Sequence, residues 1–239
     1  TASLLCDGAV DQAQSNDVRE VHRVLRQYAK VMEAVMRKID CEQGSTEWIS
    51  HRLGVPSASM FAKIVTTKGA WSTQADGYIN QLIAEDLTGE PTPFYQNEHM
   101  ARGTELEPEA RSAYEFMNDV VVEQVGFCLH DTMRAGCSPD GLVGDEGGLE
   151  IKCPSGAVHV SYLRDGKLPS KYYQQVMGCL WITGRKWWDF MSYHPDMKPL
   201  IVRVERDEEY ITALEANVSK AVDLIAVNVD KFFTKEKNK

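Results

Sequence analysis

The 239-residue sequence contains no uninterrupted apolar run of the roughly 18 residues that a membrane-spanning helix requires. Its first residues also lack the basic stretch and apolar core of a secretory signal. Six cysteines are scattered without a CxxC pair, which argues against a zinc ribbon, an iron–sulfur cluster or a disulfide framework. These absences favour a cytoplasmic protein with reduced thiols and no membrane partner.

Positive charge is also scarce, because 26 Lys and Arg residues face 35 Asp and Glu residues and give a net charge of -9. This balance argues against broad, nonspecific binding of nucleic acids. It leaves room for a nucleic-acid enzyme, since metal-binding carboxylates themselves add negative charge. Local basic clusters are either phosphate contacts or ordinary solvated surface; they comprise Arg164, Lys167 and Lys171, and separately Arg185 and Lys186.

The chain is interpreted as an N-terminal extension over residues 1–44 and one mixed α/β domain over 45–239. Within the extension, apolar residues recur every three or four positions and predict an amphipathic helix over 17–39, with Asp17 as N-cap and Glu20 as its capping-box partner. That helix either packs on its own domain or docks a partner or second subunit. Further helices are expected at 46–52, 57–65, 76–87, 98–117, 171–182 and 207–228, a β-rich region at 120–153, and strands at 186–193 and 200–204.

The segment 135–153, AGCSPDGLVGDEGGLEIKC, carries the strongest chemical signal. GDEGG is typical of a turn between two short apolar runs, so the segment predicts a β-hairpin with its turn near Asp145. In that register, Asp140 lies opposite Glu150 on the neighbouring strand. Glu150 and Lys152 share one face, whereas Ile151 points the other way into the core.

Two carboxylates and an ammonium on one surface favour a hard divalent cation, Mg²⁺ or Mn²⁺, held together with water and a substrate phosphate. Such a cation lowers the pKa of its water and stabilises charge on a phosphoryl oxygen. The ammonium of Lys152 can orient the attacking water and offset charge in the transition state. The pattern therefore indicates hydrolysis of a phosphodiester; the alternative is a surface hairpin with a salt bridge.

Four strings in order place this hairpin in a wider context: HRLGVPSAS at 51–59, RAGCSPDGL at 134–142, GLEIKCP at 148–154 and YYQQVMGCLW at 172–181. Together they resemble the bacteriophage lambda exonuclease family of the PD-(D/E)xK nucleases, over about residues 42–209. The resemblance implies a restriction-endonuclease-like core, in which helices flank a central mixed β-sheet. The helix predicted at 17–39 is an addition to that core.

The resemblance also implies roles for individual residues. Asp140 and Glu150 match the metal ligands of the family, with the backbone carbonyl of Ile151 as a third ligand, and Lys152 matches the catalytic lysine. Three further residues match catalytic positions: Asp131, Glu107 and Gln175. Glu105 and Glu109 remain alternatives to Glu107, and Gln174 is adjacent to Gln175.

A second set of residues resembles a pocket for a 5′-phosphate, namely Arg52, Ser59 and Ser138. The alternatives are a surface salt bridge for Arg52 and a cap of a helical turn for Ser59. Lys68 lies in the loop that would face the entering duplex. Trp71 in the same loop is either an aromatic wedge or a core residue.

The resemblance implies a Mg²⁺-dependent 5′-to-3′ exonuclease that digests one strand of linear double-stranded DNA with a 5′-phosphorylated end. The 3′ overhangs would serve homologous recombination by strand annealing in a phage or prophage. A ring-shaped homotrimer and a single-strand annealing protein as partner are expected on the same ground. The alternatives are a structure-specific or restriction-like endonuclease on the same core and a non-catalytic DNA-end-binding protein.

Overall fold

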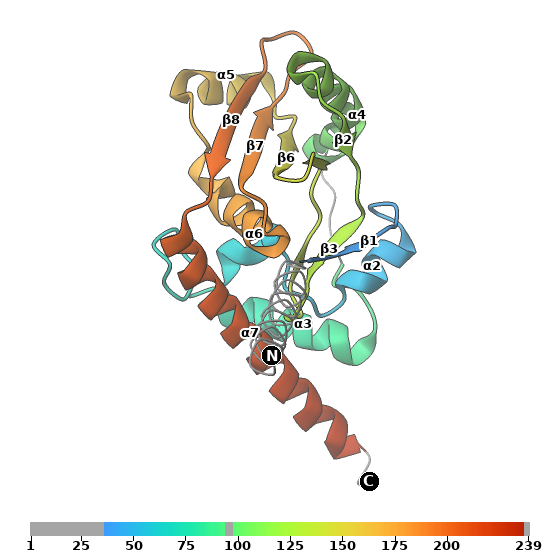
Figure 1. Ribbon diagram of the computed structural model, residues 1–239. Coiled ribbons are helices and arrows are strands. Elements are labelled where there is room, and N and C mark those ends of the chain that lie inside the picture. Colours follow the sequence, from blue (N-terminus) through green and yellow to red (C-terminus); the bar gives the residue numbers. More distant parts are fainter. Residues whose placement is uncertain (1–35, 94–97, 237–239) are drawn as a thin grey trace, which may run out of the picture. The chain divides into compact units, whose positions relative to one another are not determined.

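The computed structural model describes residues 36–93 and 98–236 (Figure 1). The central sheet has five strands in the order β2-β5-β6-β7-β8, in which β6 and β7 are parallel and the other neighbours antiparallel. A second sheet has the order β1-β3-β4. The strands are β1 Met36–Ile39, β2 Val122–Glu123, β3 Phe127–His130, β4 Gly136–Cys137, β5 Gly141–Val143, β6 Gly147–Lys152, β7 Trp187–Ser192 and β8 Leu200–Glu205.

Helices cover both faces of the central sheet, as the expected PD-(D/E)xK core requires. On one face, α4 packs Ala110 and Tyr114 against Leu149 and Ile151 of β6. The other face carries the larger core, which includes residues of η1, α3, α6 and α7. The helices are α2 Thr46–Arg52, η1 Ala58–Lys63, α3 Ala75–Thr88, α4 Glu98–Asn118, α5 Gly156–Asp165, η2 Ser170–Tyr172, α6 Tyr173–Thr183 and α7 Glu208–Glu236. None of these helices combines the length and apolar character needed to cross a bilayer.

Local sequence explains how the helices are placed. Ser45 caps α2, because its side chain accepts a hydrogen bond from the backbone N–H of Trp48 at 3.1 Å. Asp207 caps α7 in the same way through the N–H of Tyr210. Gly178 allows α6 to approach η1 closely, since an added Cβ would overlap the ring of Phe61. The caps set where α2 and α7 begin, and Gly178 sets how closely α6 packs on η1; α2 and α6 both contribute residues to the site.

The hairpin predicted at 135–153 is confirmed. β5 pairs with β6 so that Gly141 lies opposite Leu149, and the same register brings Asp140 opposite Glu150. Arg185 holds the turn by donating from Nη1 to the carbonyl oxygens of Gly144 and Gly147 at 2.7 and 2.6 Å. Because Arg185 is buried for this purpose, it is a structural residue and not a surface contact for DNA. Lys186 next to it pairs with Glu146.

One expectation about secondary structure is wrong, and one helix was missed. Met36–Ile39, expected as the end of the helix over 17–39, form β1 and pair with β3, with Met36 opposite His130. The remainder of that predicted helix lies outside the described residues. Helix α5 was not expected at all; it buries only His159 and Tyr162, so it lacks the apolar stripe by which a helix is recognised.

Asp189 of β7 organises a buried polar cluster in the sheet. Its carboxylate accepts a hydrogen bond from Tyr114 of α4 at 2.7 Å and two from Arg203 of β8, each at 2.9 Å. Arg203 also lies over the ring of Trp187, 3.7 Å from its centroid. Asp189 is 2% exposed, and these partners compensate the cost of burying its carboxylate.

Asp189→Ala is expected to lower the free energy of unfolding by about 2 kcal/mol, because the buried Tyr114 hydroxyl loses its acceptor and Arg203 its partner. Urea unfolding followed by circular dichroism measures this loss. Asp196→Ala is the control: its carboxylate is 89% exposed, so the change should stay within about 0.5 kcal/mol. Equal stability of the two variants would contradict the structural role of Asp189.

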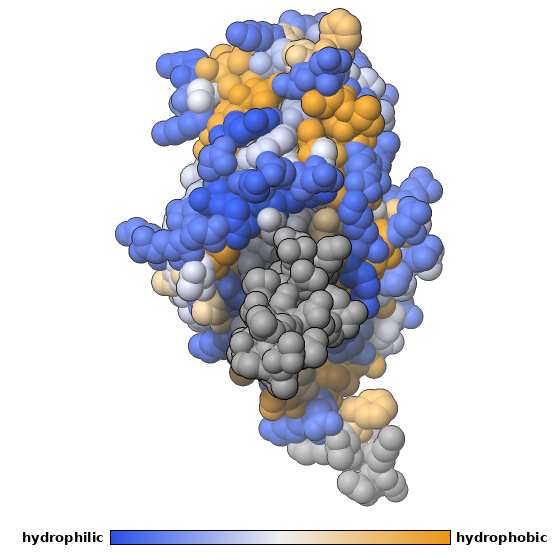
Figure 2. Space-filling view, in the orientation of Figure 1, coloured by the Kyte–Doolittle hydropathy of each residue, from blue (hydrophilic) through white to orange (hydrophobic). Residues whose placement is uncertain are grey.

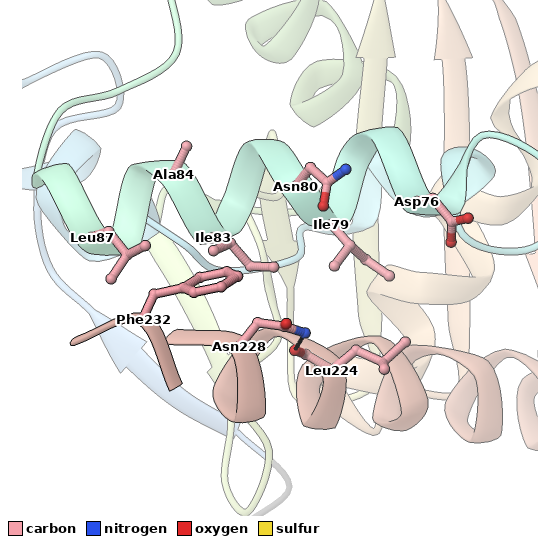
Figure 3. A pocket seen from close by; sticks show the side chains of 9 residues that line it. All are labelled: Asp76, Ile79, Asn80, Ile83, Ala84, Leu87, Leu224, Asn228 and Phe232. Atoms are coloured by element: carbon pink, nitrogen blue, oxygen red, sulfur yellow. Dashed lines mark hydrogen bonds between the residues drawn. The ribbon is translucent and has the colours of Figure 1, made fainter. Parts of the chain in front are cut away.

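A cavity of about 520 Å³ lies between α3 and α7 (Figure 3). Ile83, Leu87 and Phe232 point into it, and Asn80 and Asn228 add amide groups. None of the predicted site residues lines it. A different surface is apolar near the end of α4 and the start of β2, where Phe116 and Val121 are exposed; the space-filling view shows apolar residues gathered over this region (Figure 2).

Candidate active site

Glu150 lies at the centre of the predicted site and is completely buried. Its Oε1 atom accepts a hydrogen bond from Nε2 of Gln175 at 2.6 Å and forms an ion pair with Lys152. Its Oε2 atom is buried and has no hydrogen-bond partner among the described residues. A buried carboxylate oxygen without a hydrogen-bond partner costs free energy, so Oε2 is suited to contact a bound cation.

Lys152 lies beside Glu150 and reaches toward Asp140, with Nζ 4.0 Å from Oδ2. Burial raises the pKa of Glu150 to about 7, with the charge of Asp140 adding to the effect and that of Lys152 opposing it. Burial alone would lower the pKa of Lys152, but the two carboxylates outweigh it and hold this pKa above its ordinary value. Lys152 therefore remains an ammonium.

Asp140 faces Glu150 as the predicted register requires. Its Oδ2 atom accepts a hydrogen bond from the backbone N–H of Ile151 at 2.6 Å. Because the N–H and C=O of one strand residue point to the same side, the carbonyl of Ile151 is directed to the side of Asp140 as well. The side chain of Ile151 is buried against α4, as expected from the alternation along β6.

Helix α4 brings Glu107 to this group from the other face of the sheet. Glu107 pairs with Arg111, which donates from Nε to the carbonyl oxygen of Asp140 at 3.1 Å. Burial and the nearby Asp140 raise the pKa of Glu107. Glu109 instead accepts a hydrogen bond from the hydroxyl of Tyr193 at 2.5 Å, and Glu105 is exposed. Of the three glutamates, Glu107 is therefore the one directed at the group.

Gln175, and not Gln174, is the glutamine that contacts Glu150. Gln174 is buried on another side of α6, where its amide donates to the carbonyl oxygen of Val65 at 3.4 Å. For Asp131 the structure shows a different contact: it follows β3, and its ion-pair partner is His130 at 3.3 Å. A catalytic role for Asp131 remains a prediction.

Within residues 36–93 and 98–236, the His, Cys, Asp and Glu side chains form no preassembled group of three or more that would hold a metal ion. The carboxylates of Asp140 and Glu150 are instead directed at an N–H group and an ammonium. The donor set nevertheless fits Mg²⁺ or Mn²⁺, because both are hard cations bound by a few carboxylate oxygens and water. The unpartnered Oε2 of Glu150 is the observation that supports this fit.

The residues expected to bind a 5′-phosphate form a second group. Arg52 donates from Nη1 to the hydroxyl of Ser138 at 2.9 Å and from Nη2 to that of Ser57 at 3.4 Å, and Ser57 contacts Ser59 at 3.2 Å. Among the described residues Arg52 forms these hydrogen bonds and no ion pair. Burial lowers its pKa. A partly buried guanidinium surrounded by hydroxyls is suited to an anion.

Trp48 belongs to this second group, although it was not singled out from the sequence. Its ring lies under the guanidinium of Arg52, 4.1 Å from centroid to Cζ, and its Nε1 donates to the hydroxyl oxygen of Ser138 at 2.9 Å. Ser138 thus accepts from both Trp48 and Arg52, which occupies both lone pairs and leaves its hydroxyl hydrogen available for donation to a ligand. The available signal was the spacing, because residues four apart on α2 share a face.

The loop with Lys68 and Trp71 is fixed to α7. Tyr210 and Asn217 of that helix donate to the carbonyl oxygens of Thr66 and Gly69, each at 3.0 Å. Lys68 is exposed on this loop. Trp71 is partly buried against the larger core, with Nζ of Lys220 4.2 Å from its ring centroid. Of the two alternatives for Trp71, an aromatic wedge or a core residue, its packing against the core favours the second.

Comparisons with known proteins agree with this architecture. A structure of LHK-Exo in complex with dAMP shares 35% identity with a TM-score of 0.74, and one described as an alkaline exonuclease (LHK-Exo) from Laribacter hongkongensis shares 36% with a TM-score of 0.73; each match covers 81% of this chain and 99% of the other. A phage related exonuclease from Haemophilus somnus shares the fold at 15% identity and a TM-score of 0.55, over 74% of this chain and 96% of its own.

Two sequence comparisons complete these findings. An uncharacterized protein of Acanthamoeba polyphaga mimivirus is 29% identical over 174 residues, which are 66% of this chain but only 30% of that protein. The family described as YqaJ-like viral recombinase domain matches residues 47–186, which are more than half of the chain and include every residue of both groups. The chain therefore belongs to the YqaJ-like viral recombinase domain family, among the lambda-exonuclease-like members of the PD-(D/E)xK nucleases.

Proposed function

We propose that this chain is a Mg²⁺-dependent exonuclease that digests one strand of linear double-stranded DNA in the 5′-to-3′ direction. The 3′ overhangs would serve homologous recombination by strand annealing. The observation that carries the proposal is the buried Glu150, whose unpartnered oxygen lies in a group with Asp140 and Lys152. The relatives described as exonucleases support the reaction class.

Asp140, Glu150 and the carbonyl of Ile151 are the groups that would hold the cation. A bound Mg²⁺ would lower the pKa of a water and stabilise charge on the phosphoryl oxygen. Gln175 keeps the carboxylate of Glu150 in one orientation through its 2.6 Å hydrogen bond. Lys152 is paired with Glu150 in the structure. With a cation on that carboxylate, the ammonium would be available to orient the attacking water and to offset the charge that develops on the phosphate.

The group around Arg52 would define which end is attacked. A terminal 5′-phosphate carries more charge than an internal one, and a guanidinium with adjacent hydroxyls binds it through charge-assisted hydrogen bonds. Ser138 contacts Arg52 and is only two residues from Asp140, so the anchored end and the reacting bond lie close together. Release of single nucleotides follows from this spacing. The relative in complex with dAMP, a nucleoside monophosphate, is in line with such a product.

A homotrimeric ring and a single-strand annealing protein as partner are further parts of the proposal, and both rest on the resemblance to the lambda exonuclease family. The exposed apolar surface with Phe116 and Val121 offers area for a contact of this kind, because large exposed apolar side chains mark interaction surfaces. Lys68, exposed on its loop, would contact the entering duplex.

Removal of the metal provides the first test. Linear duplex DNA with a labelled 5′-phosphate should release labelled mononucleotides in Mg²⁺ or Mn²⁺, and an excess of chelator should abolish this release because the hydrolysis lacks its cation. Covalently closed circular DNA should remain intact under the same conditions, which separates an exonuclease from a restriction-like endonuclease. Cleavage of the circle, or release that persists in chelator, would refute the proposal.

A further inference from the structure

The hairpin that carries Asp140 is interrupted just where it reaches the site. Val122 pairs with Val143, and six residues away along each strand Cys128 pairs with Cys137, so one register runs through both sheets. Between them the ladder stops, over residues 124–127 on one strand and 138–141 on the other. By the same register, Val125 faces Asp140 and Gly126 faces Pro139. The backbone that holds Asp140 is therefore without ladder bonds to its neighbour.

Gln43 fills this interruption. Its Nε2 atom donates to the carbonyl oxygen of Val125 at 3.0 Å and to that of Pro139 at 2.9 Å. A primary amide nitrogen carries two hydrogens, so each carbonyl receives its own hydrogen bond. Gly126 makes room for this arrangement, because an added Cβ would overlap the carbonyl oxygen of Cys41. One side chain thus replaces the missing ladder across both strands.

The three residues on the interrupted strand have separate tasks. Ser138 belongs to the group around Arg52, Pro139 is held by Gln43, and Asp140 faces Glu150. The peptide fixed by Gln43 therefore lies between the proposed phosphate pocket and the proposed metal ligand. Trp48 links the two strands at the neighbouring position, because its Nε1 donates both to the carbonyl oxygen of Gly126 and to the hydroxyl oxygen of Ser138.

We propose that Gln43 is a positioning residue, which sets the placement of Asp140 relative to Ser138 by holding the Pro139 carbonyl. The proposal rests on the function proposed above. Gln43 does not touch the substrate; it acts through the backbone of residues 138–140. Its loss should leave the 5′-phosphate bound but displace the reacting bond from the carboxylates.

The experiment compares the unchanged 239-residue chain with its Gln43→Met variant, in which the side chain keeps its length and loses both donors. We expect kcat on 5′-phosphorylated duplex to fall about 10-fold and the Kd for Mn²⁺, measured by calorimetry without DNA, to rise about 10-fold, as is typical when a partner of a metal ligand is lost. KM for the phosphorylated duplex should change less than about twofold, because Arg52 and Ser138 stay in place. Gln81→Leu, a substitution on α3 whose amide contacts Glu85, should alter none of these values.

The results separate failure of the role proposed for Gln43 from failure of the proposed nuclease function. Mn²⁺ affinity and kcat within about twofold of the unchanged protein would overturn the role of Gln43 alone. Failure of the unchanged protein to bind Mn²⁺ or to digest duplex would overturn the proposed function instead. If thermal unfolding shows that Gln43→Met is not folded, Gln43→Asn takes its place, because the shorter amide keeps its donors but cannot span both carbonyls. Normal kinetics of Gln43→Asn would equally overturn the inference.

Discussion

Replacing Glu150 with glutamine is expected to reduce the rate of duplex digestion by about a thousand-fold while the protein remains folded. The change removes the negative charge that a cation needs at this position and keeps the shape of the side chain. Glu150 is completely buried and burial raises its pKa, so the neutral amide is no harder to accommodate than the carboxylate. Release of labelled mononucleotides measures the rate, and thermal unfolding confirms the fold.

Glu146→Gln is the matched control for this prediction. Glu146 lies in the turn of the same hairpin, is 56% exposed and pairs with Lys186, away from the site. Its replacement should leave digestion unchanged, because exposed ion pairs contribute little. Full activity of Glu150→Gln would exclude the group of Asp140, Glu150 and Lys152 as the catalytic centre. Equal loss in both variants would attribute the effect to damage of the hairpin.

Arg52→Gln is expected to abolish the preference for 5′-phosphorylated ends, with a loss of about 100-fold in kcat/KM on those ends. The guanidinium is the cation of the proposed pocket, and its partners in the structure are hydroxyls and an aromatic ring. A glutamine amide at this position lacks the charge that distinguishes a terminal phosphate from a hydroxyl. Parallel digestion of phosphorylated and dephosphorylated linear duplex measures the ratio of the two rates.

Arg164→Gln removes the same charge from the exposed end of α5 and serves as the control. This change weakens any general attraction to DNA equally for both substrates, so the ratio of rates should not move. An unchanged ratio in Arg52→Gln would remove the proposed pocket, even if its overall rate fell.

The hairpin was predictable because its signals are local. The turn residues GDEGG and the alternation of Glu150, Ile151 and Lys152 determine which side chains share a face, and the observed register confirms this. The choice between Gln174 and Gln175 was open, since it depends on the rotation of α6 about its axis. That rotation follows from packing of the whole helix, with Gln174 on the buried side near Val65.

The parts that could not be predicted depend on contacts between distant segments. Met36–Ile39 have an apolar spacing that suits a helix, but pairing with β3, some ninety residues away in sequence, makes them a strand. Trp48 and Gln43 likewise acquire their roles from Gly126, Ser138 and Pro139, which the sequence alone does not place beside them. Asp131 was assigned from the resemblance alone; in the structure its ion-pair partner is His130, and its catalytic role remains a prediction.

The interrupted strand at 138–140 has a consequence for how this protein tolerates change. Three consecutive residues there are each held from a different side, by Arg52, by Gln43 and by Ile151. A single inserted or deleted residue would shift at least one of the three out of reach, since each step of extended chain is about 3.3 Å. Variation in chain length should therefore be confined to other loops, and libraries of insertions should find this tripeptide among the least permissive sites of the protein.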